Sequence, residues 1–178
     1  MLRTQLLVVL LLCLVVTSAS AGEPAFISEV RGGVYSHDID FWSFKREQGV
    51  DVNGEILFVS PEVLSVLFAP RPHVGATLNT AGDTSHVYAG LTWEYDMTPD
   101  FFVDLNLGGS AHNGKLDTDD NDRKSFGSSL LFRVGGAVGY RLTSNWNISL
   151  QYEHMSNAYI ADPNEGMDNL GVRLGYCF

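Results

Sequence analysis

Apolar and polar residues alternate one by one through most of this chain, and this period of two constrains the fold more than any other feature of the sequence. In the run 169–178, Leu170, Val172 and Leu174 share one face, whereas Arg173 lies on the other. Successive side chains of a β-strand point to opposite faces of a sheet, so each such run predicts a strand with one polar face. Clusters of Gly, Asn, Asp and Pro separate the runs, as turns do.

The N-terminal segment differs from the rest of the chain. Arg3 precedes an apolar run over residues 6–16, and a small-residue pattern of Ala and Ser follows it. This run is too short to cross a bilayer as a helix, which takes about 20 residues. We therefore predict a signal peptide over residues 1–21, removed on export, and a single domain over residues 22–178.

Eight alternating runs predict an all-β fold with antiparallel strands. They cover residues 26–35, 50–58, 72–79, 86–95, 101–107, 130–140, 145–156 and 169–178. Sharing the mature chain among eight strands leaves about 20 residues for a strand and its connection, which suits membrane-spanning strands of about 9–11 residues. Side chains fill the interior of an eight-stranded barrel, so a pore is not expected.

Two features favour a transmembrane barrel over a soluble lipocalin-like barrel or sandwich, in which strands also alternate. Charged residues of both signs lie deep within the strands on the polar face, as a paired interior network requires. They are Glu29, Arg31, Glu55, Glu94, Asp104, Arg133, Glu153 and Arg173. Aromatic residues lie towards the ends of the runs on the apolar face, as in the girdles of outer-membrane barrels. They are Trp93, Tyr95, Tyr140, Trp146, Tyr152, Tyr176 and Phe178. We therefore predict an eight-stranded antiparallel outer-membrane β-barrel.

The charge of the chain bears on its partners. Once Arg3 is removed, 10 Lys and Arg face 21 Asp and Glu, a net charge of −11. Nucleic acid is not an expected partner, because no basic stripe is present to neutralise phosphates. No metal or cofactor is expected. The acidic run 117–122 lacks the central Gly and terminal Glu of an EF-hand loop. Its neighbours Lys115, Arg123 and Lys124 are candidates for contact with lipid phosphates.

Counting strands from a periplasmic start predicts which connections face outwards. They are residues 36–49, 80–85, 110–126 and 157–167, and the first and third are long and polar, as external loops usually are. His37 and His112 are expected in these loops. By alternation, His73 and His86 are expected to point into the barrel.

The run 145–156 carries an anomaly on its lipid-facing side. Its apolar face continues by the period of two to His154 and Ser156. Polar side chains are costly against lipid, and a purely structural barrel has no use for them there. Residues i and i+2 of a strand lie about 6.5–7 Å apart, so an imidazole can reach the neighbouring hydroxyl. This pairing of nucleophile and base is the one that an ester hydrolase needs.

A third group must orient the imidazole and stabilise its charged form. Asp168 precedes Leu170 by two residues, so it is expected on the same outer face, across the hairpin from His154. Glu165 is the rival acid, but it falls in the turn and off the strand pattern. The predicted catalytic group is therefore Ser156, His154 and Asp168, near the external end of the strands.

The segments 154–158 (HMSNA) and 163–168 (PNEGMD) resemble the signature of the PagL-type lipid A 3-O-deacylases. The resemblance is tight in the last 25 residues and loose over the rest of the mature chain. It implies a serine hydrolase triad on the outside of an eight-stranded outer-membrane barrel, with Ser156 as nucleophile, His154 as general base and Asn157 in the oxyanion hole. The third residue of the best-known members is Glu, and the matching position here is Asp168.

The leading hypothesis is an outer-membrane serine esterase that removes the 3-O-linked acyl chain of lipid A in lipopolysaccharide, with its site facing the outer leaflet. One alternative is a non-enzymatic barrel for envelope integrity or adhesion. Another is an outer-membrane phospholipase or acyltransferase. Residue chemistry alone does not separate these lipid substrates, so the choice of lipid A rests on the resemblance.

Overall fold

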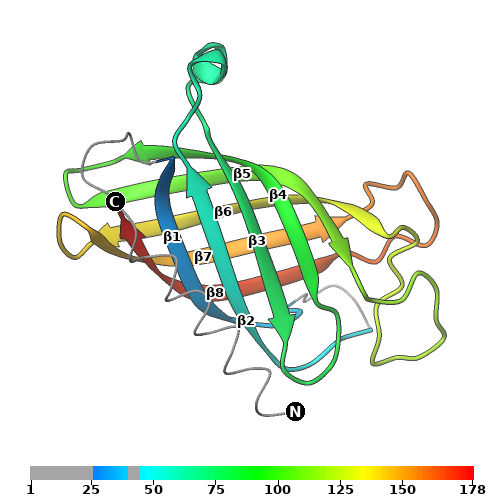
Figure 1. The fold of residues 1–178 in the computed structure, drawn as a ribbon. Coiled ribbons are helices and arrows are strands. Elements are labelled where there is room, and N and C mark those ends of the chain that lie inside the picture. The colour runs from blue at the N-terminus through cyan, green and yellow to red at the C-terminus, as the bar shows by residue number, and fades with distance from the viewer. Residues whose placement is uncertain (1–25, 40–44) are drawn as a thin grey trace.

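The computed structural model describes residues 26–39 and 45–178, so the predicted signal peptide lies outside the described residues. Eight antiparallel strands form a closed barrel, in which each strand pairs with its sequence neighbours and the first pairs with the last (Figure 1). The strands are β1 (Ile27–Ser36), β2 (Val50–Phe58), β3 (Arg71–Asn79), β4 (His86–Asp96), β5 (Phe101–His112), β6 (Leu130–Arg141), β7 (Trp146–Ser156) and β8 (Met167–Cys177). The predicted strand number and pairing are confirmed. Within the described part of the chain, no helix has the length and apolar character to cross a membrane.

The fifth strand is longer than the alternation predicts. β5 continues to His112, whose Cα pairs with that of His86, and the connection after it covers residues 113–129. The prediction that His112 lies in a loop is therefore wrong. The small residues from Gly108 to Ala111 hide the alternation of side chains, but their backbones pair with β4 and β6.

The inward faces carry the predicted ion-pair network. Arg31 lies 2.7 Å from Glu29 and 2.6 Å from Asp104, while Arg173 lies 2.9 Å from Glu55. Seven of the eight predicted interior charges are buried, and the Glu94 side chain is partly exposed. His73 and His86 are also buried, as predicted. These paired charges fill the interior and leave the outer face of the strands apolar.

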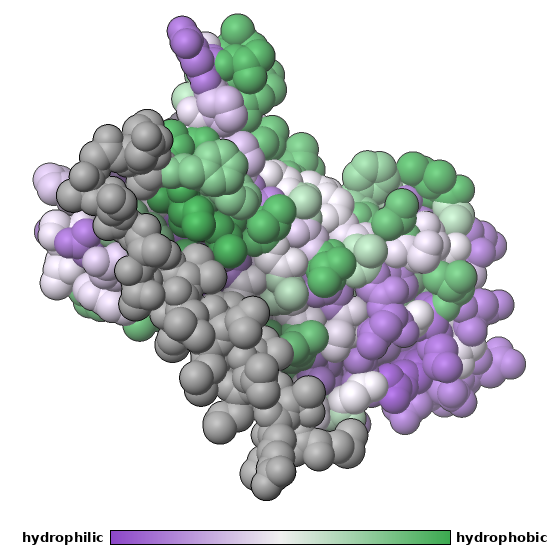
Figure 2. Space-filling view, in the orientation of Figure 1, coloured by the Kyte–Doolittle hydropathy of each residue, from purple (hydrophilic) through white to green (hydrophobic). Residues whose placement is uncertain are grey.

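The two ends of the barrel differ. We call the end with connections 37–49, 80–85, 113–129 and 157–166 the loop end, and the other the turn end. Figure 2 shows hydrophilic residues gathered at the loop end, on the right of the view. The turn end carries outward aromatic pairs in ring contact, including Phe101 with Tyr140 and Trp146 with Tyr176. Tyr140, Trp146 and Tyr176 belong to the aromatic girdle that the sequence predicts for a membrane interface, and Phe101 adds a fourth ring to it.

Contacts between loops close the loop end. His37 is buried between the carboxylates of Asp51 (2.8 Å) and Glu47 (3.0 Å). Burial disfavours the charged imidazole, but hydrogen bonds to both carboxylates raise the pKa of His37 to about 9. Lys124 is also fully buried, with its Nζ 3.4 Å from Asp38 Oδ1. The predicted contact of Lys124 with lipid phosphates is therefore wrong, because the loops fold over this cation and pair it internally.

Candidate active site

The β7–β8 hairpin brings Ser156, His154 and Asp168 together on the outer surface, at the loop end of the barrel. His154 and Asp168 lie directly opposite each other in the strand register. His154 Nδ1 lies 2.6 Å from Asp168 Oδ1, and His154 Nε2 lies 3.1 Å from Ser156 Oγ. The same faces of the two strands carry the exposed Leu150 and Leu170. The three residues that the sequence singles out are thus within hydrogen-bonding distance and face outwards.

This geometry fixes what the imidazole can do. An ionised Asp168 accepts a hydrogen bond from the Nδ1–H of neutral His154, which leaves the lone pair of Nε2 for the Ser156 hydroxyl proton. A serine hydrolase uses this relay of acid, base and nucleophile. The side chains of His154 and Asp168 are 37% and 17% exposed, so a reactant can approach them from the side of the barrel.

Tyr152 is a contact of this group that the sequence analysis assigned only to the aromatic girdle. Its hydroxyl donates to Asp168 Oδ1 at 2.8 Å, the same oxygen that pairs with His154. Tyr152 precedes His154 by two residues on the outward face of β7. The period of two that identified His154 and Ser156 therefore also contained the signal for Tyr152.

Gly166 packs against the imidazole from the loop before β8. A Cβ atom at this position would lie 2.6 Å from His154 Cε1 and 3.4 Å from His154 Nε2. Real Cβ atoms do not approach other atoms as closely as the first of these distances, so a larger residue would have to move the ring. The glycine thus permits the rotamer in which His154 reaches both Ser156 and Asp168.

Asn157 is engaged elsewhere in the loop after β7. Its buried Nδ2 donates to the carbonyl oxygens of Phe126, Ala161 and Pro163 at 2.8–2.9 Å. Its backbone N–H donates to Asn164 Oδ1 at 2.8 Å. The side chain therefore orders the loops around Ser156, and this geometry does not support a direct oxyanion contact from the Asn157 carboxamide.

The rival acid Glu165 does not contact His154 in this structure. Its Oε2 accepts a hydrogen bond from the backbone N–H of Ser125 at 2.6 Å, and its Oε1 lies 3.5 Å from Lys45 Nζ. Glu165 therefore ties the last loop to the loop after β5. Asp168 is the acid that meets the imidazole.

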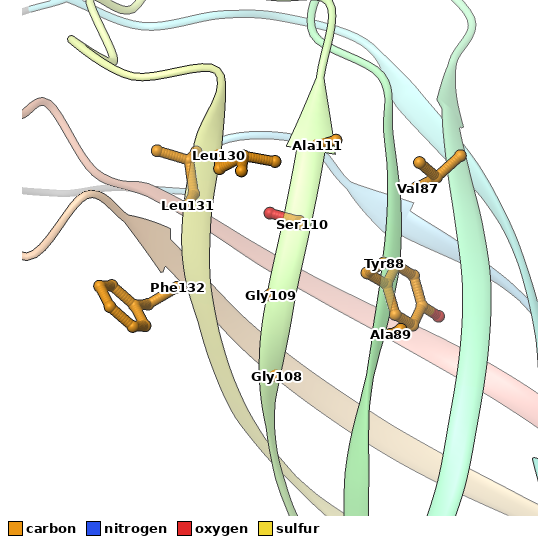
Figure 3. A pocket seen from close by; sticks show the side chains of 10 residues that line it. All are labelled: Val87, Tyr88, Ala89, Gly108, Gly109, Ser110, Ala111, Leu130, Leu131 and Phe132. Carbon is orange, nitrogen blue, oxygen red and sulfur yellow. The ribbon is translucent and has the colours of Figure 1, made fainter.

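An open apolar groove of about 660 Å³ lies on the outer surface of β4, β5 and β6, at their loop-end halves (Figure 3). Small residues line it, including Ala89 and Gly109, while Leu130 and Phe132 provide larger apolar side chains. Phe132 lies directly opposite Ser156 in the register of β6 and β7. The groove therefore begins one strand away from the serine.

Residues 26–39 and 45–178 contain no cluster of three His, Cys, Asp or Glu side chains that could hold a metal ion. In the acidic run, Asp117, Asp119, Asp120 and Asp122 are all exposed to solvent.

Comparison with known proteins identifies the family of the chain. A family model described as lipid A 3-O-deacylase (PagL) matches residues 74–177, more than half of the chain. The chain belongs to this family. The lipid A deacylase PagL of Bordetella bronchiseptica is 31% identical over 78 residues, which cover 44% of this chain and 42% of that protein. The match thus spans less than half the length of this curated PagL relative.

Solved structures agree on the fold. The crystal structure of the outer membrane enzyme PagL matches with a TM-score of 0.65 at 18% identity, covering 85% of this chain and all of that chain. A de novo designed transmembrane β-barrel matches with a TM-score of 0.56 at 14% identity, covering 88% of this chain and 98% of that one. This PagL-family chain is therefore an all-β barrel of the outer-membrane type.

Proposed function

We propose that this PagL-family protein is a serine esterase that hydrolyses the 3-O-linked acyl ester of lipid A. The observation that carries the proposal is the hydrogen-bonded chain Ser156–His154–Asp168 on the lipid-facing surface. A polar relay has no structural use on that face, but a lipid ester can reach it by lateral diffusion. The family membership favours lipid A among the lipid esters.

The proposed reaction has two steps. His154 Nε2 takes the proton from Ser156 Oγ while this oxygen attacks the ester carbonyl, and Asp168 stabilises the imidazolium. The tetrahedral intermediate expels the sugar 3-oxygen, which receives the proton from His154, and an acyl-serine remains. Water, activated by His154, then hydrolyses the acyl-serine, which releases the fatty acid and restores the Ser156 hydroxyl.

The developing oxyanion needs hydrogen-bond donors near Ser156. The Asn164 carboxamide accepts the Asn157 backbone N–H through its oxygen, which leaves its NH₂ group as a donor. The following backbone at Ala158 and Tyr159 has φ values of 53° and 61°, a left-handed conformation that non-glycine residues rarely adopt. Strained backbone of this kind clusters at functional sites, and it is the second proposed source of donors.

We propose that the apolar groove beside Phe132 binds the acyl chain whose ester bond is cleaved. It opens onto the hydrocarbon region and begins one strand from Ser156. A side chain at Gly109 would meet only the Leu131 carbonyl oxygen at 3.6 Å, so the groove can be filled there without distorting the barrel. Gly109→Leu is expected to slow hydrolysis of long-chain esters strongly and of a short-chain soluble ester only slightly. Equal loss on both substrates would argue against this role of the groove.

The site is proposed to face the outer leaflet. The two longest connections, 37–49 and 113–129, lie at the loop end, where the triad also lies, while β1 begins and β8 ends at the turn end. Outer-membrane barrels have short periplasmic turns and longer external loops. This orientation places Ser156 among the lipopolysaccharide molecules.

Mass spectra of lipid A from a Gram-negative host test the activity. Expression of the intact protein is expected to remove one hydroxyacyl group, whereas Ser156→Ala leaves lipid A unchanged. Ser149→Ala is the matched control, since Ser149 lies on the same strand but is buried on the inward face. Release of fatty acid from phospholipids with unchanged lipid A would favour a phospholipase. No lipid change with the intact protein would favour a non-enzymatic barrel.

A further inference from the structure

The connection between β2 and β3 differs from the other connections at the turn end. The β4–β5 and β6–β7 connections are the short segments 97–100 and 142–145, whereas residues 59–70 form a longer projection. It contains the 3-10 helix η2 (Glu62–Leu67), none of whose residues is buried. In Figure 1 the helix stands away from the barrel wall, beyond the ends of β2 and β3. A barrel needs no such projection to join two neighbouring strands, since two to five residues suffice for a hairpin.

The projection exposes far more apolar surface than a water-facing turn needs. Val63 is 75% exposed, Val66 is 81% exposed, and Phe68, which follows the helix, is 85% exposed. Figure 2 shows hydrophobic residues gathered over this tip. Glu62 is the only charged residue between Val59 and Ala69. Apolar side chains clustered in this way mark a contact surface.

The helix is amphipathic. Residues three apart lie above one another on a 3-10 helix. Glu62 and Ser65 therefore share a polar face, Val63 and Val66 share an apolar face, and Leu64 and Leu67 lie together beside it. A helix with this division suits the boundary between water and hydrocarbon, with its polar face towards water.

A hydrogen bond ties the projection to the lipid-facing surface. The indole Nε1–H of Trp93, on β4, donates to the Leu67 carbonyl oxygen at 2.8 Å. Trp93 belongs to the aromatic residues of the turn end, where Phe26 and Phe58 also form an outward ring pair. This hydrogen bond holds the end of η2 beside the apolar belt. The exposed side chains of η2 therefore extend the belt away from the barrel wall.

We propose that residues 59–69 form a lipid-seated projection, in which Val63, Val66 and Phe68 insert among the acyl chains of the leaflet that surrounds the turn end. The occupant is phospholipid, because the surface continues the membrane-facing belt and carries no basic residue for an anionic partner. The projection widens the contact of the barrel with this leaflet on the side of β2 and β3. This inference depends on the barrel's membrane location and not on the proposed esterase activity.

Spin labels on single cysteines test the seating. The exported protein, with Cys177→Ser to remove its own thiol, is reconstituted into vesicles of phosphatidylethanolamine and phosphatidylglycerol. Labels replace Val63 and Val66 on the apolar face, and Ser65 on the polar face of the same helix. Leu150→Cys, on the lipid-facing side of β7, and Ser144→Cys, in a short exposed turn, give the hydrocarbon and water references. All five positions lie outside the buried interior, so the barrel is expected to fold.

The measured quantity is the accessibility of each label to oxygen relative to a water-soluble nickel complex. The proposal expects this ratio to be severalfold higher at positions 63 and 66 than at positions 65 and 144, and close to the value at position 150. Ratios at 63 and 66 equal to that at 144 would overturn it, because the projection would then lie in water. Spin–spin broadening that disappears on dilution with unlabelled protein would also overturn it, in favour of contact with a second copy.

Discussion

The inside and the outside of the barrel use ionisable residues in opposite ways. Inside, Arg31 contacts both Glu29 and Asp104, and all three side chains are at most 1% exposed. Outside, His154 and Asp168 form a single partly exposed pair that ends on the Ser156 hydroxyl. A buried charge is stable in the interior only when it is paired, whereas the outer face of a membrane barrel can be wholly apolar. The polar group on the outer face therefore supports the proposed chemistry, whereas the larger charge network inside the barrel is explained by the need to fill the interior with paired side chains.

The largest expected effect concerns the outer acid. Asp168→Asn keeps the size of the side chain but removes the charge that orients and stabilises His154, so we expect kcat to fall by about three to four orders of magnitude. Hydrolysis of a lipid A substrate by purified protein in mixed micelles measures it. Asp168→Glu is the rescue variant and should retain a substantial part of the activity. Near-normal turnover by Asp168→Asn would remove this residue from the triad.

Substitutions in the interior ion-pair network are expected to change the stability of the barrel and not its catalytic rate. Arg31→Ala removes the closest cation of Asp104 and leaves Glu29 with Arg71 alone. Breaking a buried ion pair by removal of one partner typically costs about 3–5 kcal/mol. Urea unfolding in micelles, followed by tryptophan fluorescence, measures the free energy of unfolding. Arg141→Ala is the control, because its ion pairs at the turn end are partly exposed and worth about 1 kcal/mol or less. If Arg31→Ala folds but no longer hydrolyses the substrate, the proposed division between a structural interior and a catalytic outer face is wrong.

A smaller effect is expected where the loop packs against the imidazole. Gly166→Ala puts a methyl group 2.6 Å from His154 Cε1 and must displace the ring. Misplacing a catalytic group by about 1 Å can cost about 100-fold, so we expect kcat to fall roughly 10- to 100-fold with little change in stability. At Gly32 a Cβ would meet only the Asn53 carbonyl oxygen, at 3.9 Å, so Gly32→Ala serves as the control. Equal kcat in both variants would show that the ring tolerates the methyl group.

The smallest effect is expected from Tyr152→Phe. This change removes one of the two hydrogen bonds to Asp168 Oδ1 and keeps the ring on the membrane side. A net hydrogen bond is worth about 1 kcal/mol, which corresponds to roughly a fivefold lower kcat. Because Tyr152 acts through Asp168, KM should stay close to its original value, and Tyr152→Phe should add little to Asp168→Asn. Full additivity in that double variant would mean that Tyr152 works independently of the acid.

The sequence by itself determined the strand number, the inward charges and the outward position of Ser156 and His154. A period of two is a local property of the chain, so it needs no knowledge of distant contacts. The same pattern placed Asp168 on the matching face of the next strand. The pattern did not predict β5 beyond Leu107, because small residues such as Gly and Ala carry no alternation. The connection 59–70 formed no part of the predicted strand pattern.

Only the tertiary structure decided the contacts between segments far apart in the chain. The fold of the loops over the barrel end buried His37 and Lys124, and it engaged Asn157 with three carbonyl oxygens, one of them from the loop after β5. The register between β6 and β7 determined that Phe132, and with it the groove, lies next to Ser156. Hydrogen-bond partners, burial and register depend on closure of the whole sheet, which is a property of all eight strands together and of no single run.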